Sequence, residues 1–320
     1  MAMKKLYHTK LKLSGLFGAL ATLLCLCTLT GFLGAFWWGF EITSHFRLQY
    51  AIALSATAAF CIWRKEGKIA VIMVLFALVN AALFVPGYFS RPAEVGSPSP
   101  TLWLMQLNVR TSNRRSDLVK KFIQEKKPDV IVLEEVDDWW VEDLADLIKT
   151  YPNAITLPRE DNFGIAVYSK KPLIRHRVLY LGEAQLPSLL IQIYVETKTV
   201  SILGTHAVPP EGPDNSELRN AHFRALGELL SDRKGLVVLM GDLNTTPWSP
   251  YFKKLLRDTG LVDSAQGYGV QPTWPVHSFP LWIPIDHCLV SPRLHVTRRE
   301  VGRNVGSDHF PLLVEVAVTD

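Results

Sequence analysis

The hydrophobic positions divide the chain into two regions with different patterns. Between residues 13 and 89 almost every position is apolar, whereas the rest of the chain mixes apolar and polar positions as a soluble domain does. The apolar region contains three runs, at about Leu13–Phe40, Phe46–Trp63 and Ile69–Phe89. A helix needs roughly 20 apolar residues to cross a bilayer, and the first and third runs reach that length. We therefore expect three transmembrane helices in a membrane anchor of residues 1–89.

Two of these runs have features that bear on this expectation. The first could be a cleaved signal peptide, but it is longer than the hydrophobic region of such peptides and two more apolar runs follow it. The second is shorter and begins with Arg47 and Gln49, whose long side chains can reach the lipid headgroups. The sequence thus favours an anchor that stays attached.

Basic residues predict how this anchor is oriented. They precede the first run and lie between the second and third, at Lys4, Lys5, Lys10, Lys12, Arg64, Lys65 and Lys68. Because loops rich in Lys and Arg stay in the cytoplasm, the N-terminus should be cytoplasmic. Three crossings then place everything after Phe89 on the far side of a plasma or inner membrane, so we expect a multi-pass protein with an extracytoplasmic domain.

Beyond residue 100 the pattern changes to short apolar or alternating runs separated by polar segments, and a Pro- and Ser-rich linker at residues 90–100 precedes this change. The period of two and the short buried runs predict strands at Thr101–Leu107, Val130–Leu133, Gly164–Ser169, Leu189–Val195, Thr199–Thr205, Leu236–Met240, Asp286–Val290 and Leu312–Val318. Helical spacing predicts helices at Ser116–Lys126, Val141–Lys149, Asn215–Leu230 and Pro250–Asp258. Many strands with interspersed helices indicate an α/β sandwich over residues 101–320, with helices outside two sheets.

Polar residues recur at the ends of the predicted strands. They are Asn108, Glu135, His206, Asp242, Asn244, Asp286, Asp308 and His309. Each one alone could be a turn former, a helix cap or a solvated charge. Their recurrence at one kind of place favours a shared site, and carboxylate and amide oxygens suit Mg²⁺ together with a substrate phosphate. A phosphate-ester site is therefore the better interpretation.

The strand-end motifs resemble those of the endonuclease/exonuclease/phosphatase superfamily, whose fold is shared by DNase I-like nucleases, inositol-polyphosphate phosphatases and neutral sphingomyelinases. The matching segments, in order, are Gln106–Val109, Pro128–Val136, Gly164–Lys170, Gly204–His206, Gly241–Asn244, Ile285–His287 and Gly306–His309. They extend over nearly all of residues 101–320. The resemblance implies a four-layer α/β/β/α sandwich of the DNase I type and a divalent metal, usually Mg²⁺, with Mn²⁺ as an alternative.

The resemblance also implies a metal site. By position in the motifs, Glu135 resembles the main metal ligand, and Asn108 resembles its neighbour in the metal and phosphate shell. Asp308 would complete the network around the metal or the histidine.

The same comparison assigns roles in catalysis. Asp242 and Asn244 resemble the pair that orients the attacking water and the phosphoryl oxygens. His309 resembles the histidine beside the scissile phosphate, with Asp286 as its carboxylate partner. His206 matches the histidine that donates to a phosphate oxygen in the family.

The substrate is the least determined feature. Arg110 stands where the related apurinic endonucleases have an acidic residue, and the net charge of +4 comes without a long basic run, which weakens a nucleic-acid substrate. The anchor followed by such a domain resembles bacterial membrane members linked to glycopeptide-antibiotic resistance, which implies a polyprenyl pyrophosphate or another phosphorylated lipid at the outer membrane face. The alternatives are a membrane-tethered nuclease or phosphodiesterase and, in another class, an inactive binding module. The oligomeric state and any part of the anchor in substrate binding stay open.

Overall fold

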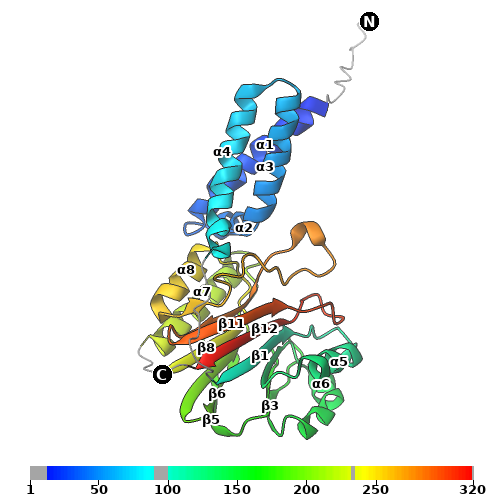
Figure 1. Ribbon diagram of the computed structural model, residues 1–320, viewed down its shortest axis with the longest axis vertical. Coiled ribbons are helices and arrows are strands. Elements are labelled where there is room, and N and C mark those ends of the chain that lie inside the picture. The colour runs from blue at the N-terminus through cyan, green and yellow to red at the C-terminus, as the bar shows by residue number, and fades with distance from the viewer. Residues whose placement is uncertain (1–12, 90–99, 232–234, 319–320) are drawn as a thin grey trace, which may run out of the picture.

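The computed structural model describes residues 13–89, 100–231 and 235–318. The basic residues before the first apolar run and nearly all of the predicted linker at 90–100 lie outside the described residues. In Figure 1 the apolar region forms a helical unit that stands on a sandwich of strands and helices.

The helical unit contains four α-helices. These are α1 (Leu13–Thr30), α2 (Trp38–Ser44), α3 (Arg47–Trp63) and α4 (Gly67–Phe84), with short 3₁₀ segments at Gly31–Leu33 and Val85–Tyr88. Helices α1, α3 and α4 pack side by side, and α2 lies across their base, next to the sandwich (Figure 1). Their small common core includes Leu54, Ala58 and Met73, whereas many outward-facing apolar side chains are exposed.

The structure supports only part of the prediction of three membrane helices. Among the described residues, Gly67–Tyr88 is long and apolar enough to cross a membrane, and a second span results only if the bent pair Phe17–Leu33 and Trp38–Ser44 counts as one. The prediction of one continuous first segment was wrong, because the chain bends by 115° between these helices. The bend brings the two segments close together: a Cβ atom on Gly34 would lie 3.0 Å from the backbone of Glu41. Helix α3 has 17 residues, which is short for a span.

The sandwich contains two sheets of six strands each. Their strands are β1 (Thr101–Asn108), β2 (Val130–Glu134), β3 (Asn153–Leu157), β4 (Ile165–Ser169), β5 (Leu173–Leu181), β6 (Leu186–Val195), β7 (Lys198–Thr205), β8 (Leu236–Asp242), β9 (Val262–Asp263), β10 (Asp286–Val290), β11 (Leu294–Val301) and β12 (Leu312–Val318). The strand orders are β11-β12-β1-β2-β4-β3 in the first sheet and β5-β6-β7-β8-β10-β9 in the second. Strands β3, β5, β9 and β11 were not predicted.

Helices cover the outer faces of both sheets. Residues of α5 (Ser116–Lys126) and α6 (Asp138–Asp143) pack on the first sheet, and those of α7 (Pro213–Leu230) and α8 (Pro250–Thr259) pack on the second (Figure 1). The largest apolar cluster draws on strands of both sheets and fills the space between them. The expected α/β/β/α layering is therefore present.

One predicted helix has different bounds. The segment expected to be helical at Val141–Lys149 is instead α6 followed by a 3₁₀ turn at Ala145–Lys149. Helix α6 begins earlier because the Asp137 carboxylate accepts a hydrogen bond from the Trp140 backbone nitrogen at 2.9 Å and caps its N-terminus.

Each sheet contains one parallel strand pair, and these pairs place the candidate residues. Strands β1 and β2 run parallel with Asn108 opposite Glu134, and β7 and β8 also run parallel. Strand β10 runs antiparallel to β8, so its first residue, Asp286, lies opposite the last residue of β8, Asp242. Polar residues from both sheets therefore meet at one edge of the sandwich.

Candidate active site

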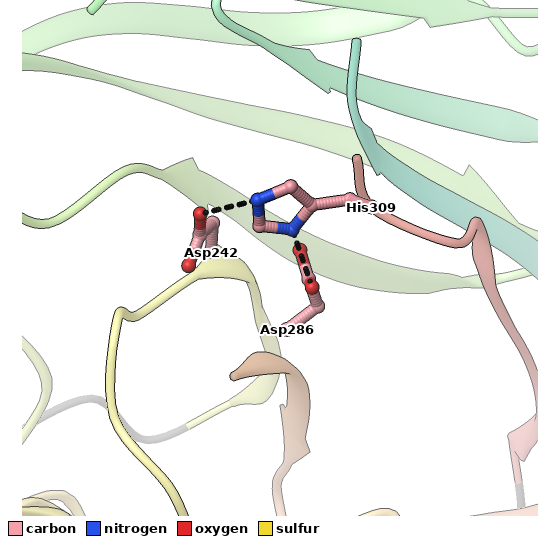
Figure 2. A group of neighbouring side chains, drawn as sticks. All are labelled: Asp242, Asp286 and His309. Carbon is pink, nitrogen blue, oxygen red and sulfur yellow. Dashed lines mark hydrogen bonds and ion pairs between the residues drawn. The ribbon is translucent and has the colours of Figure 1, made fainter. Parts of the chain in front are cut away.

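The imidazole ring of His309 lies between two carboxylates, as Figure 2 shows. Its Nδ1 atom is 2.9 Å from Oδ2 of Asp286, and its Nε2 atom is 3.6 Å from Oδ2 of Asp242. All three side chains are almost fully buried. The segment before β12 supplies the histidine, and the facing ends of β8 and β10 supply the carboxylates.

Burial and charge set the protonation of this group. Burial alone would lower the pKa of His309, but the carboxylates of Asp286 and Asp242 outweigh it and raise the pKa to about 10. Burial would raise the pKa of Asp286, yet the His309 ring and hydrogen bonds lower it below its ordinary value. For Asp242, burial prevails and raises the pKa to about 7. Near neutral pH, His309 therefore holds a proton while Asp242 can bind or release one.

Gln106 and Glu134 belong to the same hydrogen-bonded group, but the sequence analysis did not identify them as site residues. The Gln106 amide nitrogen donates to Asp286 at 2.7 Å and to Glu134 at 2.9 Å. Burial, and then the charge of Asp286, raises the pKa of Glu134 well above its ordinary value. Both residues stand inside the motifs quoted above, but no role was assigned to them, and the structure buries them within β1 and β2. Glu134 is thus a neutral group that fixes Gln106.

A second group of polar atoms lies beside the first. The Asn108 amide nitrogen donates to Glu135 at 2.8 Å and to Asp242 at 3.2 Å. Glu135 also accepts from the Thr111 backbone nitrogen at 3.2 Å. Its φ of +57° is uncommon for a residue with a side chain, and such backbone is found where a site requires it.

The donor set fits a hard divalent cation. With Glu134 neutral, the carboxylates of Asp242 and Asp286 flank the protonated His309 ring, and Glu135 adds a third carboxylate that the Asn108 amide joins to Asp242. One oxygen or nitrogen each from Asp242, Asp286 and His309 lie within 4.8 Å of one another. Carboxylate and amide oxygens are the ligands that Mg²⁺ accepts.

Asn244 and His206 form the side of the site next to Asp242. The Asn244 amide nitrogen donates to the Ala207 carbonyl at 2.9 Å and lies 3.4 Å from Nε2 of His206. That Nε2 atom is 3.6 Å from Oδ2 of Asp242. Burial, and then the charge of His309, lowers the pKa of His206 to about 3, so this ring is neutral. Gly241, inside β8, allows close approach to the end of β7, because a Cβ there would lie 1.7 Å from the Thr205 carbonyl oxygen.

Asp308 lines the cavity, and its charge contributes to the raised pKa of His309. Its Oδ2 atom is 3.4 Å from the Trp274 indole nitrogen and 4.0 Å from the Arg110 guanidinium. Among the contacts of the described residues, none joins Asp308 to Glu135 or Asn108. The neighbouring Ser307 instead ties the segment to the site, because its hydroxyl donates to the Asn108 carbonyl at 2.7 Å.

The polar groups open into a cavity of about 730 Å³. Glu135, His206, Asp242, Asn244, Asp308 and His309 line it. Asn108 and Asp286 do not line the cavity and affect it only through the lining residues that they contact. The structure thus brings all eight predicted residues to one place, six of them at the cavity.

Comparisons with known proteins identify the fold. A model of the Endonuclease/Exonuclease/phosphatase family matches residues 105–309. No curated protein matched the chain. Among solved structures, the human Nocturnin catalytic domain with bound sulfate anion is 18% identical with a TM-score of 0.58, covering 73% of this chain and 99% of that one.

Two further structures are similar. An endonuclease/exonuclease/phosphatase from Beutenbergia cavernae is 20% identical with a TM-score of 0.56, covering 68% of this chain and 72% of that one. D. rerio TDP2 complexed with single strand DNA product is 14% identical with a TM-score of 0.55, covering 68% and 98%. At these identities the likeness shows the fold alone. The family model, in contrast, includes every strand-end residue from Asn108 to His309, and the chain therefore belongs to the endonuclease/exonuclease/phosphatase family.

Proposed function

We propose that this chain is a metal-dependent phosphohydrolase that cleaves a phosphate ester or pyrophosphate of a lipid at the outer face of a membrane. Members of its family are hydrolases of phosphoester bonds and generally use a divalent metal. The observation that carries the proposal is the His309 ring held between the carboxylates of Asp242 and Asp286 beside a cavity of about 730 Å³.

The metal in this proposal is Mg²⁺, with Mn²⁺ as an alternative. Glu135 would be its main ligand, with Asn108 beside it and Asp308 at the outer edge. When bound, a divalent cation neutralises charge on the phosphoryl oxygens. The Asn108 amide would keep Glu135 and Asp242 at a fixed separation, because it donates to both.

The remaining residues would handle water and protons. Asp242, with a pKa of about 7, can accept a proton from the attacking water, which Asn244 would help to orient. His309 can donate its Nε2 proton to an oxygen of the phosphate or the leaving group, and Asp286 keeps the ring charged and oriented. The neutral His206 would donate a hydrogen bond to a phosphoryl oxygen.

The helical unit supports a membrane location and a lipid substrate. Its outward side chains are apolar and exposed, for example Leu23, Leu26 and Leu78, at 53–60% of their surface. If all three apolar runs cross the bilayer, the basic residues near the N-terminus keep that end in the cytoplasm and the sandwich lies outside. The substrate would then be reached from the membrane surface.

The test uses the full chain purified in detergent. It should release phosphate from a polyprenyl pyrophosphate when Mg²⁺ is present and stop when a chelator is added. His309→Ala is the matched inactive control. No metal-dependent release from any lipid phosphate or pyrophosphate would reject the proposal.

A nuclease is the second candidate, because the structurally similar D. rerio TDP2 was solved with a single strand DNA product. Phosphodiester and phosphomonoester attack require the same metal and water chemistry. The small net charge of +4 argues against a nuclease. Robust, salt-sensitive nicking of plasmid DNA by the same preparation would favour the nuclease over the lipid phosphohydrolase.

A further inference from the structure

One wall of the active-site cavity comes from the helical unit. Ile42 near the end of α2, and His45 and Phe46 just before α3, line the same cavity as Glu135 and His309. In Figure 1, α2 lies where the helical unit meets the sandwich, beside α7 and α8. The catalytic groups and the base of the helical unit therefore face one space.

Buried polar contacts fix this wall against the sandwich. The Glu41 carboxylate accepts from the Arg219 guanidinium at 2.5 Å and from the Ser249 hydroxyl at 2.6 Å. The Glu41 and Arg219 side chains are at most 1% exposed. Nδ1 of His45 lies 2.9 Å from the Thr246 hydroxyl. Because a buried ion pair tolerates little displacement of its charges, these contacts give the wall one position relative to the catalytic residues.

The wall and its surroundings suit an apolar group. Ile42 and Phe46 are only partly buried, which leaves part of each side chain free to contact a ligand. Further apolar residues of the sandwich line the cavity, namely Phe163, Leu186, Val208, Leu218, Ile283 and Ile285. A cavity of about 730 Å³ lies within the range of roughly 300–1,000 Å³ that holds a drug-sized ligand, so it accommodates much more than a phosphate.

His45 contributes a polar side chain to this wall. Its side chain is 5% exposed, and Nε2 has no hydrogen-bond partner among the described residues, although Nδ1 is paired. The His45 ring is therefore a buried polar group that lines the cavity and is held by Thr246. The wall combines apolar contact with one polar side chain.

We infer that Ile42, His45 and Phe46 form a substrate subsite that binds the hydrocarbon chain of a lipid phosphate next to its scissile phosphate, with His45 contacting the polar headgroup. This inference rests on the proposed function and makes the helical unit part of the active site. Its apolar surface would deliver the chain from the bilayer directly to this wall.

The test compares two pyrophosphates that differ only in hydrocarbon length, dimethylallyl and farnesyl, with the full chain in a fixed concentration of detergent. The wild type should have a higher kcat/KM for farnesyl pyrophosphate. Phe46→Ala should lower that value by about tenfold or more, mainly through KM, because apolar burial is lost. The value for dimethylallyl pyrophosphate should change by less than about twofold.

Matched controls come from the same helical unit. Phe36 and Ile52 are 81% and 62% exposed and do not line the cavity, so Phe36→Ala and Ile52→Ala should keep the farnesyl preference. Ile42→Ala removes fewer atoms and should reduce the preference if Phe46→Ala fails to fold, and Phe46→Leu should largely retain it.

The outcomes separate the two proposals. Hydrolysis of both pyrophosphates with an unchanged farnesyl preference in Phe46→Ala and Ile42→Ala would overturn the subsite while leaving the proposed function intact. An equal loss on both pyrophosphates would also overturn it, because it would indicate structural support alone. Hydrolysis of neither pyrophosphate by the wild type would overturn the subsite for a hydrocarbon chain of this kind, and only a further absence of metal-dependent release from every lipid phosphate would reject the proposed function itself.

Discussion

Nδ1 of His309 lies 2.9 Å from Oδ2 of Asp286, at the centre of a site that two sheets assemble. This contact, with the charge of Asp242, keeps the pKa of His309 at about 10 against the effect of burial. It therefore determines whether the ring can act as an acid at neutral pH.

Asp286→Asn should remove much of that support. The pKa of His309 should fall, the alkaline limb of the kcat–pH profile should move to lower pH, and turnover at neutral pH should drop by roughly 10²–10⁴-fold. The measurement is kcat across pH for this variant and, as control, for Asp258→Asn on α8, which pairs with Lys254 and does not line the cavity. An unmoved alkaline limb would show that Asp286 does not set the protonation of His309.

Two adjacent glutamates should respond differently to the same substitution. Glu134 has a strongly raised pKa and is neutral, so Glu134→Gln should keep activity within a few-fold and preserve folding. Glu135→Gln removes a negative charge from the cavity and should greatly weaken metal-dependent activity. Initial rates of both variants at one Mg²⁺ concentration provide the comparison. Equal losses would contradict the neutral state assigned to Glu134.

Buried His222 should make stability depend on pH. Burial lowers its pKa to about 4, whereas the unfolded chain keeps about 6.5. Between these values the unfolded chain binds more protons. The stabilisation is therefore full above about pH 6.5 and is lost as the pH falls towards 4, by about 3 kcal/mol.

Thermal unfolding between pH 4 and 7 measures this effect. His222→Gln, which can still hydrogen-bond Thr205, should show a shallower loss of melting temperature towards acid than the wild type. His277→Gln, at an exposed position, should leave the slope unchanged. Identical slopes for all three proteins would contradict a neutral, buried His222.

The Glu41–Arg219 ion pair should be important for attachment of the helical unit to the sandwich. Glu41→Ala leaves the Arg219 charge buried without its partner and should destabilise the chain by about 3–5 kcal/mol. Asp258→Ala, which breaks the exposed pair with Lys254, should cost at most about 1 kcal/mol. Thermal unfolding in detergent tests both, and a similar small cost for both would show that the buried pair is not needed.

The layered fold and the grouping of the candidate residues could be predicted because strand ends carry both signals. Asn108 and Asp242 end apolar strands and His309 precedes one, and strand pairing within each sheet together with packing of the two sheets brings these ends together. Edge strands such as β5 were not predicted because their exposed, mixed positions resemble loops in a single sequence.

The junction with the helical unit could not be predicted. The bend before α2 places Gly34 against Glu41, and the wall containing Phe46 depends on contacts between positions about 200 residues apart, such as His45 and Thr246. Local patterns do not encode such distant pairings. Gln106 and Glu134 were missed for a related reason, because buried polar residues inside strands show their partners only in three dimensions.

The central claim is that Glu135 binds the metal and His309 donates a proton. A Mg²⁺ titration of the initial rate tests this claim most directly. Glu135→Ala should raise the Mg²⁺ requirement, with partial recovery in excess metal, because mass action offsets a weakened site. His309→Ala should lower turnover by roughly 10²–10⁴-fold at every Mg²⁺ concentration. Rescue of His309→Ala by metal, with no rescue of Glu135→Ala, would contradict the account.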